Sequence, residues 1–126
     1  MPRISRDDAP VVLDVPPVEF RNAELAEFTA AFETFRLDSD PAPLYRGLPD
    51  DRCQCPHWGY VFSGKIVFRF ADHDETYSAG DAFYAAPGHV PVCYAGTELI
   101  EFSPTELARK TEEVIGKNMA AGVQAL

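Results

Sequence analysis

The chain has 126 residues, which fits one domain, and 46% of them are hydrophobic, which is enough for a packed core. It carries 20 Asp and Glu against 11 Lys and Arg, so its formal net charge is -9. That charge argues against nucleic acid and anionic membrane surfaces as partners.

Residues 1–18 hold four prolines and few periodic apolar positions, which predicts an extended arm. They lack the apolar core of a signal peptide, and no run of 18 apolar residues occurs in the chain. We therefore expect a cytoplasmic protein that does not associate with a membrane. In that compartment its three cysteines would be free or metal-bound rather than bridged.

Residues 19–37 fit two kinds of secondary structure. Their apolar positions from Leu25 to Phe35 fit either one helical stripe or an alternating strand. We favour a short turn at Arg21–Ala23 followed by a strand. Residues 38–51 are rich in Pro and Asp, which predicts a loop.

From residue 52 to residue 103, turn residues recur at short intervals between apolar segments. Ser63–Lys65 predicts a hairpin turn, and residues 71–76 and Gly80–Asp81 predict further turns. The predicted strands are 58–62, 66–70, a strand starting at 76–78, 82–86, 87–94 and 97–103. This spacing predicts an all-β antiparallel sandwich or barrel.

A helix is predicted over about residues 105–119. Pro104 suits a helix start, and Leu107, Val114, Ile115 and Met119 form a partial apolar stripe. We interpret residues 1–126 as a single domain.

Two segments resemble the motifs of the cupin superfamily, G(X)5HXH(X)3-4E(X)6G and G(X)5PXG(X)2H(X)3N. They are GLPDDRCQCPHWGYVFSG (47–64) and GDAFYAAPGHVPVC (80–93), and the resemblance covers about 47–103. It implies an RmlC-like jelly-roll barrel that forms a homodimer and holds a divalent transition metal. It also implies a small-molecule-modifying enzyme, oxygenase- or isomerase-like, or else a non-catalytic metal- or ligand-binding module such as a sensor.

The first motif can be matched in two registers. Counted back from Gly64, His57 takes the family's Glu position and Cys53 takes a His position. Counted forward from Gly47, Cys53 and Cys55 take the two positions of the HXH pair. The resemblance therefore implies a ligand set that is shifted from the family's own.

In the second motif Gly88 aligns, and His89 lies two residues before the family's His position, which is one strand period. Thiolates and imidazoles at two-residue spacing suit Zn²⁺ or Fe²⁺. We predict a metal site of Cys55, His57 and His89, with Cys53 as a fourth candidate. The alternative is that the cysteines are buried core residues and the histidines are hydrogen-bonded.

Other side chains have expected positions relative to this site. Phe83 and Tyr84 are predicted to line the mouth of the pocket, and Cys93 to face it. The remaining expectations are an outer face with Trp58, Tyr60 and Phe62, solvated strand residues Glu98 and Glu101, and an exposed turn residue His73.

Overall fold

The computed structural model describes residues 2–123, which form antiparallel strands and one C-terminal α-helix. The strands are β1 (Val11–Val15), β2 (Val18–Leu25), β3 (Phe28–Phe35), β4 (His57–Ser63), β5 (Lys65–Arg69), β6 (Asp74–Ser78), β7 (Ala82–Ala85), β8 (Val90–Cys93) and β9 (Thr97–Pro104). Helix α1 spans Thr105–Ala120, and two 3-10 helices, η1 (Ala42–Tyr45) and η2 (Pro49–Asp51), lie in the loop before β4. The predicted all-β fold with a C-terminal helix is confirmed. In the described part of the chain, no helix has the length and apolar character to cross a membrane.

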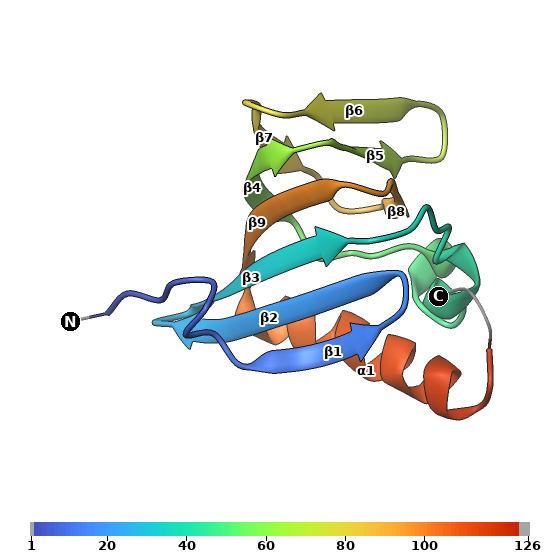
Figure 1. Cartoon of the computed structure of the whole chain (residues 1–126). Coiled ribbons are helices and arrows are strands. Elements are labelled where there is room, and N and C mark those ends of the chain that lie inside the picture. Colours follow the sequence, from blue (N-terminus) through green and yellow to red (C-terminus); the bar gives the residue numbers. More distant parts are fainter. Residues whose placement is uncertain (1, 124–126) are drawn as a thin grey trace.

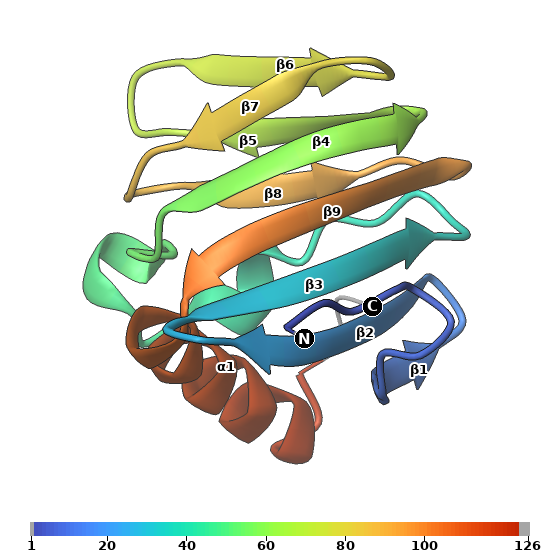
Figure 2. The ribbon, with the colours of Figure 1, turned by 90° about the vertical axis from the view of Figure 1, so that its left-hand side faces the viewer.

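The strands form two sheets (Figures 1 and 2). One sheet has six strands in the order β1-β2-β3-β9-β4-β7, and the other has three in the order β6-β5-β8. The sheets pack face to face, because Val61 and Phe83 of the first share a core cluster with Ile66 and Phe68 of the second. The hydrogen bonds therefore build a two-sheet jelly roll in place of one closed barrel.

The sequence predicted a hairpin turn at Ser63–Lys65, but the two strands that flank this turn do not pair with each other. Strand β4 pairs with β7 and β9, whereas β5 pairs with β6 and β8. The turn instead carries the chain from one sheet to the other, so that Val61 and Ile66 both enter the shared core. The same turn residues suit a hairpin and a crossing between two sheets. Only the burial of the flanking residues decides whether β4 pairs with β5 or with other strands.

The turn predicted at Arg21–Ala23 is also misplaced. Strands β2 and β3 form a regular hairpin whose last pair is Leu25 with Phe28, so the turn is at Ala26 and Glu27. Ala26 adopts a φ of 55°, which is uncommon for a residue with a side chain. No Gly, Pro or Asn lies at Ala26 and Glu27, so no local pattern indicates the position of this turn.

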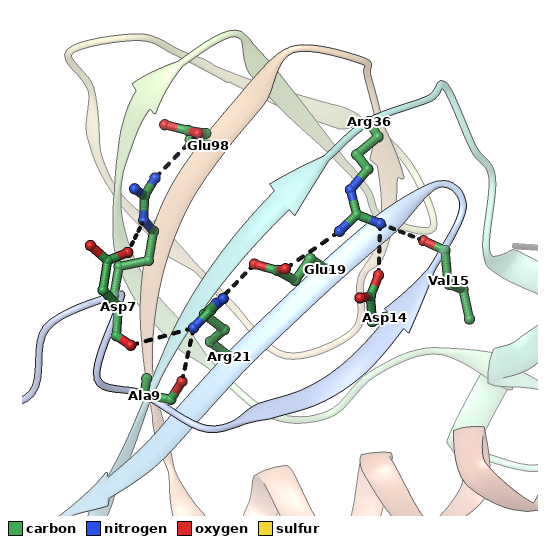
Figure 3. Close-up of polar contacts among 9 residues, drawn as sticks. Asp7, Ala9, Asp14, Val15, Glu19, Arg21, Arg36 and Glu98 are labelled. Carbon is green, nitrogen blue, oxygen red and sulfur yellow. Dashed lines mark hydrogen bonds and ion pairs between the residues drawn. The ribbon is translucent and has the colours of Figure 1, made fainter.

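The N-terminal segment is tied to the sheet along part of its length. Its second half is β1, which pairs with β2. Arg21 reaches the carbonyl oxygens of Asp7 and Ala9 at 3.5 and 3.4 Å, and Arg6 forms an ion pair with Glu98 at 3.4 Å (Figure 3). Arg36 bonds Asp14 and Glu19 in the same way, at 2.8 and 3.4 Å. Each exposed pair is worth little alone, but together they hold the segment on the outer face.

Helix α1 packs beside one end of strands β3 and β9 and on the loop that contains η1 (Figure 2). A buried hydrogen bond of 2.9 Å joins the hydroxyls of Thr29 and Thr105 at its start. Near its end, the amide of Asn118 donates to the carbonyl oxygens of Leu44 and Arg46 at 2.7 and 2.9 Å. The helix and this loop thereby close one end of the space between the sheets.

Candidate metal centre and its cavity

Three side chains that could hold a metal ion meet at the closed end of the fold. The ligand atoms of Cys53, His57 and His89 all lie within 4.8 Å of one another. Cys53 and His89 are placed by an antiparallel bridge, in which the Cys53 amide donates to the His89 carbonyl at 2.8 Å. His57 enters as the first residue of β4. The group therefore draws on three separate segments of chain.

Both imidazole rings are fixed by their second nitrogen. His89 Nδ1 lies 2.6 Å from the carbonyl oxygen of Ala86, which can only accept, so Nδ1 carries the proton and Nε2 is left as an acceptor. His57 Nδ1 lies 2.6 Å from the Ser103 hydroxyl, and its Nε2 lies 3.8 Å from Cys53 Sγ. Metal-binding histidines are typically oriented in this way, through the nitrogen that does not ligate.

The electrostatics of the group favour a thiolate. Burial acts to raise the pKa of Cys53, but hydrogen bonds with His57 and His89, and the positive charge of these rings when they are protonated, outweigh burial and lower that pKa to about 6. The pKa of His57 is in turn raised well above its ordinary value. Burial opposes that rise, and the Glu101 carboxylate and the thiols of Cys53 and Cys55 overcome it. Cys53 is thus poised to act as a ligand near neutral pH.

The donor set fits a first-row divalent cation. One thiolate and two imidazoles make three protein ligands, the number that leaves a coordination position for water or substrate. The structure brings Cys53, rather than Cys55, together with the two histidines, and Cys55 Sγ lies 3.5 Å from the Pro56 carbonyl oxygen. The expected alternation fails here because residues 54–56 are not part of a strand.

The three ligands open onto a cavity of about 160 Å³ between the two sheets. Helix α1 and η1 contribute to its wall, and the Thr111 hydroxyl on α1 lies 3.4 Å from Cys53 Sγ. Cys93 lines the cavity, as expected. Phe83 and Tyr84 do not. Phe83 stacks on Tyr77 in the core at a ring distance of 4.8 Å, and Tyr84 is exposed on the outer face.

Two carboxyl groups face the same cavity from neighbouring strands. Glu33 on β3 pairs with Leu99, and Glu101 on β9 pairs with Ala31, so the two glutamates are diagonal neighbours on one face. Glu101 Oε2 lies 3.9 Å from His57 Nδ1. Burial, followed by the charge of Glu101 and a hydrogen bond to it, raises the pKa of Glu33 well above its ordinary value.

Neither glutamate was placed correctly from the sequence. Glu101 was expected to be solvated, but β9 lies between β3 and β4 and leaves the residue only 7% exposed. Glu33 was missed because its strand was not delimited. Once the bounds of β3 are known, side-chain alternation along the strand places Glu33 on the same face as Thr29, Ala31 and Phe35, and this face is toward the cavity.

The other expected positions agree with the structure. Trp58, Tyr60 and Phe62 are exposed on the outer face of the large sheet. Glu98 is half-buried, and His73 is an exposed turn residue bonded to Asp72 and Glu75.

No family model matches the sequence, and no curated protein matches it significantly. Solved structures do match the fold. An RmlC-like cupin from Shewanella frigidimarina is 19% identical with a TM-score of 0.55, over 80% of this chain and 88% of that one. KdgF from Halomonas sp. is 18% identical with a TM-score of 0.54, over 79% of this chain and 90% of that one. The iron(II) form of HppE is 13% identical with a TM-score of 0.54, over 79% of this chain and 58% of that one.

These likenesses extend over about four fifths of the chain. The motifs at 47–64 and 80–93 supply the three clustered side chains at the position where the two sheets meet the helix. The chain therefore has the fold of the RmlC-like cupins.

Proposed function

We propose that the protein is a metal-dependent cupin enzyme that modifies a small molecule inside the cavity. The observation that carries the proposal is the group of Cys53, His57 and His89, whose ligand atoms converge at the wall of an internal cavity. A divalent metal held there would supply Lewis acidity to a bound substrate or water. The free state of all three cysteines suits a reducing cytoplasm.

The chain's own residues would provide the rest of the chemistry. Burial and the neighbouring Glu101 raise the pKa of Glu33, which favours its protonated form, and in that form it would donate a hydrogen bond to a molecule in the cavity. The Ser103 hydroxyl and the Ala86 carbonyl hold the two imidazoles in position. Helix α1 and the loop around η1 exclude water from this end of the fold.

The proposed metal is Zn²⁺ or Fe²⁺. A thiolate with two imidazoles is a common donor set for Zn²⁺ and is also compatible with Fe²⁺. The iron(II) form of HppE, which shares the fold, supports Fe²⁺ as the second candidate.

A closed, non-catalytic metal or ligand module is the alternative. It would need a fourth protein ligand, and the natural candidate is Cys55. The Cys55 thiol instead donates a hydrogen bond to the Pro56 carbonyl oxygen. This contact favours a site with three protein ligands and an open coordination position, which suits an enzyme.

Metal content and coordination test the proposal together. We expect about one equivalent of metal per chain in the purified protein, and a loss of at least about tenfold in metal affinity in Cys53→Ser and His57→Ala. His73→Ala is the matched control and should keep its metal, because His73 is exposed and pairs only with acidic neighbours.

Cobalt substitution distinguishes the open site from the closed one. The Co²⁺ form should show a thiolate charge-transfer band that is lost in Cys53→Ser and kept in Cys55→Ser. Azide should shift its visible spectrum, because a small anion can enter an open position. A charge-transfer band that is lost in Cys55→Ser, together with a visible spectrum that azide does not change, would favour the closed module. A purified protein without metal would contradict the proposal.

A further inference from the structure

The cavity lies between the two hydrophobic clusters of the fold. Val18, Ile66 and Phe68 belong to the cluster that the two sheets share, and all three line the cavity. Leu44 belongs to the second cluster, against which Ile115 of α1 packs, and both of these residues line the cavity as well. Most of the surface that a bound molecule would meet is therefore apolar.

The uncharged polar side chains of the wall are largely bonded within the protein. The Thr29 hydroxyl bonds another threonine at the start of α1 at 2.9 Å, and the Ser103 hydroxyl lies 2.6 Å from His57 Nδ1. Only the side chains of Asn22 and Tyr45 bond no other residue between 2 and 123. A ligand with many hydroxyl groups would therefore lose more hydrogen bonds to water than it could form here.

A charged ligand would find no counter-ion in this wall. No Lys or Arg is among its lining residues in the part of the chain that the structure describes. Burial and the neighbouring Glu101 raise the pKa of Glu33, which favours the uncharged acid. Glu112 also lines the cavity, but it is exposed, so water hydrates its charge. A charge that is buried without a partner costs much more than a neutral group of the same size.

The occupied metal group would itself be close to neutral. A divalent ion bound by the Cys53 thiolate retains one positive charge, and the buried Glu101 carboxylate, 3.9 Å from His57 Nδ1, offsets it. Glu101 is therefore already paired and is not free for a cationic ligand. The open coordination position then suits a neutral oxygen donor. Azide is small enough to bind at that position alone, whereas the body of a larger anion must lie against the wall.

We propose that the cavity binds a compact uncharged molecule, with an apolar body against the wall and a carbonyl or hydroxyl oxygen at the metal group. The proposal rests on the proposed function, since it names the class of substrate for the same site. The cavity volume of about 160 Å³ is similar to that of an apolar cavity that accepts benzene, so a body of about that size fits.

Two pairs of aromatic probes test the charge preference on the protein as purified at neutral pH. Benzamide and benzoate have nearly the same shape and differ in charge, as do benzyl alcohol and benzylammonium. We expect isothermal titration calorimetry to show each neutral probe binding at least about tenfold more tightly than its charged counterpart, because the charge would be buried unpaired. A charged probe that binds as tightly as its neutral counterpart, or more tightly, would overturn the proposal.

Variants test whether the probes bind inside the cavity. Ala108 on α1 and Ala31 on β3 line it, so a leucine at either position would fill part of the space. Ala108→Leu and Ala31→Leu should each weaken benzamide binding by about tenfold or more, and should keep the metal and the azide response of the cobalt form. Ala120→Leu is the matched control, because Ala120 is exposed on the same helix and is not part of the wall. Unchanged benzamide binding in both cavity variants would also overturn the proposal.

Metal analysis of the same samples separates this inference from the proposed function. Bound metal without a preference for the neutral probes would overturn the inference and leave the metal site intact. A preference for the neutral probes in a protein that holds no metal would support the uncharged ligand and contradict the metal-dependent enzyme.

Discussion

Cys53 combines features that are rarely found together in a buried residue. It is 2% exposed, yet two histidines hold its pKa at about 6, and a bridge to His89 fixes its backbone. Buried thiols without such neighbours behave in the opposite way, as Cys93 does, where burial raises the pKa to about 12. The difference between the two cysteines therefore comes from the histidines and not from burial.

This difference gives a pH-dependent prediction. In metal-free protein, thiolate absorbance in the ultraviolet should rise with a midpoint near pH 6, and this step should be absent from Cys53→Ser. Because a lowered pKa means that the thiolate exists above about pH 6 and is protonated below it, metal occupancy should fall as the pH drops through that value.

The matched control is Cys93→Ser, which should keep the step near pH 6, since Cys93 ionises only near pH 12. Occupancy that is constant from neutral pH to well below pH 6 would show that Cys53 is not a ligand.

At the scale of elements, the turn between β4 and β5 is where the chain crosses from the large sheet to the small one. Gly64 has a φ of 75°, and Thr97 Oγ1 bonds both the amide and the carbonyl of Lys65 next to it, at 3.1 and 2.9 Å. A Cβ at Gly64 would lie 2.3 Å from Thr97 Oγ1 and 2.7 Å from Thr97 Cα. The close approach of β9 therefore requires glycine here.

We predict that Gly64→Ala lowers the free energy of unfolding by about 3 kcal/mol or more, from left-handed strain and overpacking together. Gly80→Ala is the matched control, because Gly80 has a φ of 93° with no neighbour within 4 Å of the added atom. It should cost only about 1–2 kcal/mol from the backbone strain. Chemical denaturation measures both, and equal losses would show that the contact with Thr97 does not constrain the turn.

Helix α1 was predicted from its own sequence, and its role was not. Pro104 and the apolar stripe predicted the helix after β9, and Val114, Ile115 and Met119 of that stripe pack on the core. Leu107 of the predicted stripe is exposed, and Ala108 packs in its place. The position of the helix is set by hydrogen bonds to residues far away in the sequence. Thr29 bonds the start of the helix, and Leu44 bonds the region near its end. These contacts make it a wall of the cavity.

At the scale of the whole molecule, the outer face of the large sheet carries a patch of exposed aromatic side chains. It exposes the aromatic side chains of Phe28, Trp58, Tyr60, Phe62, Tyr84 and Phe102, which come from four adjacent strands. Trp58 is central, with ring distances of 5.1 Å to Tyr84 and 6.0 Å to Phe28. Contiguous exposed aromatics of this kind are typical of protein interfaces.

We expect this face to join two copies of the chain in a homodimer. Light scattering should give about twice the chain mass of 13.9 kDa at micromolar concentration. Trp58→Glu should shift the protein to a monomer, because a charge would be buried without a partner. Val12→Glu, at an exposed apolar position on β1 away from the patch, should remain dimeric. A monomeric parent protein would contradict the prediction.

The sequence by itself determined the strand-rich fold, the C-terminal helix and the two motif segments, because alternation, turn residues and helix signals act over a few neighbouring positions. It also supplied His57 and His89 as candidates. Only the tertiary structure decided that Cys53 joins them in place of Cys55, since an irregular segment at 54–56 and a bridge to His89 set that choice. The same holds for Glu33 and Glu101, which face the cavity because β3 and β9 are central strands. Strand order is fixed by long-range burial, which no local pattern of residues contains.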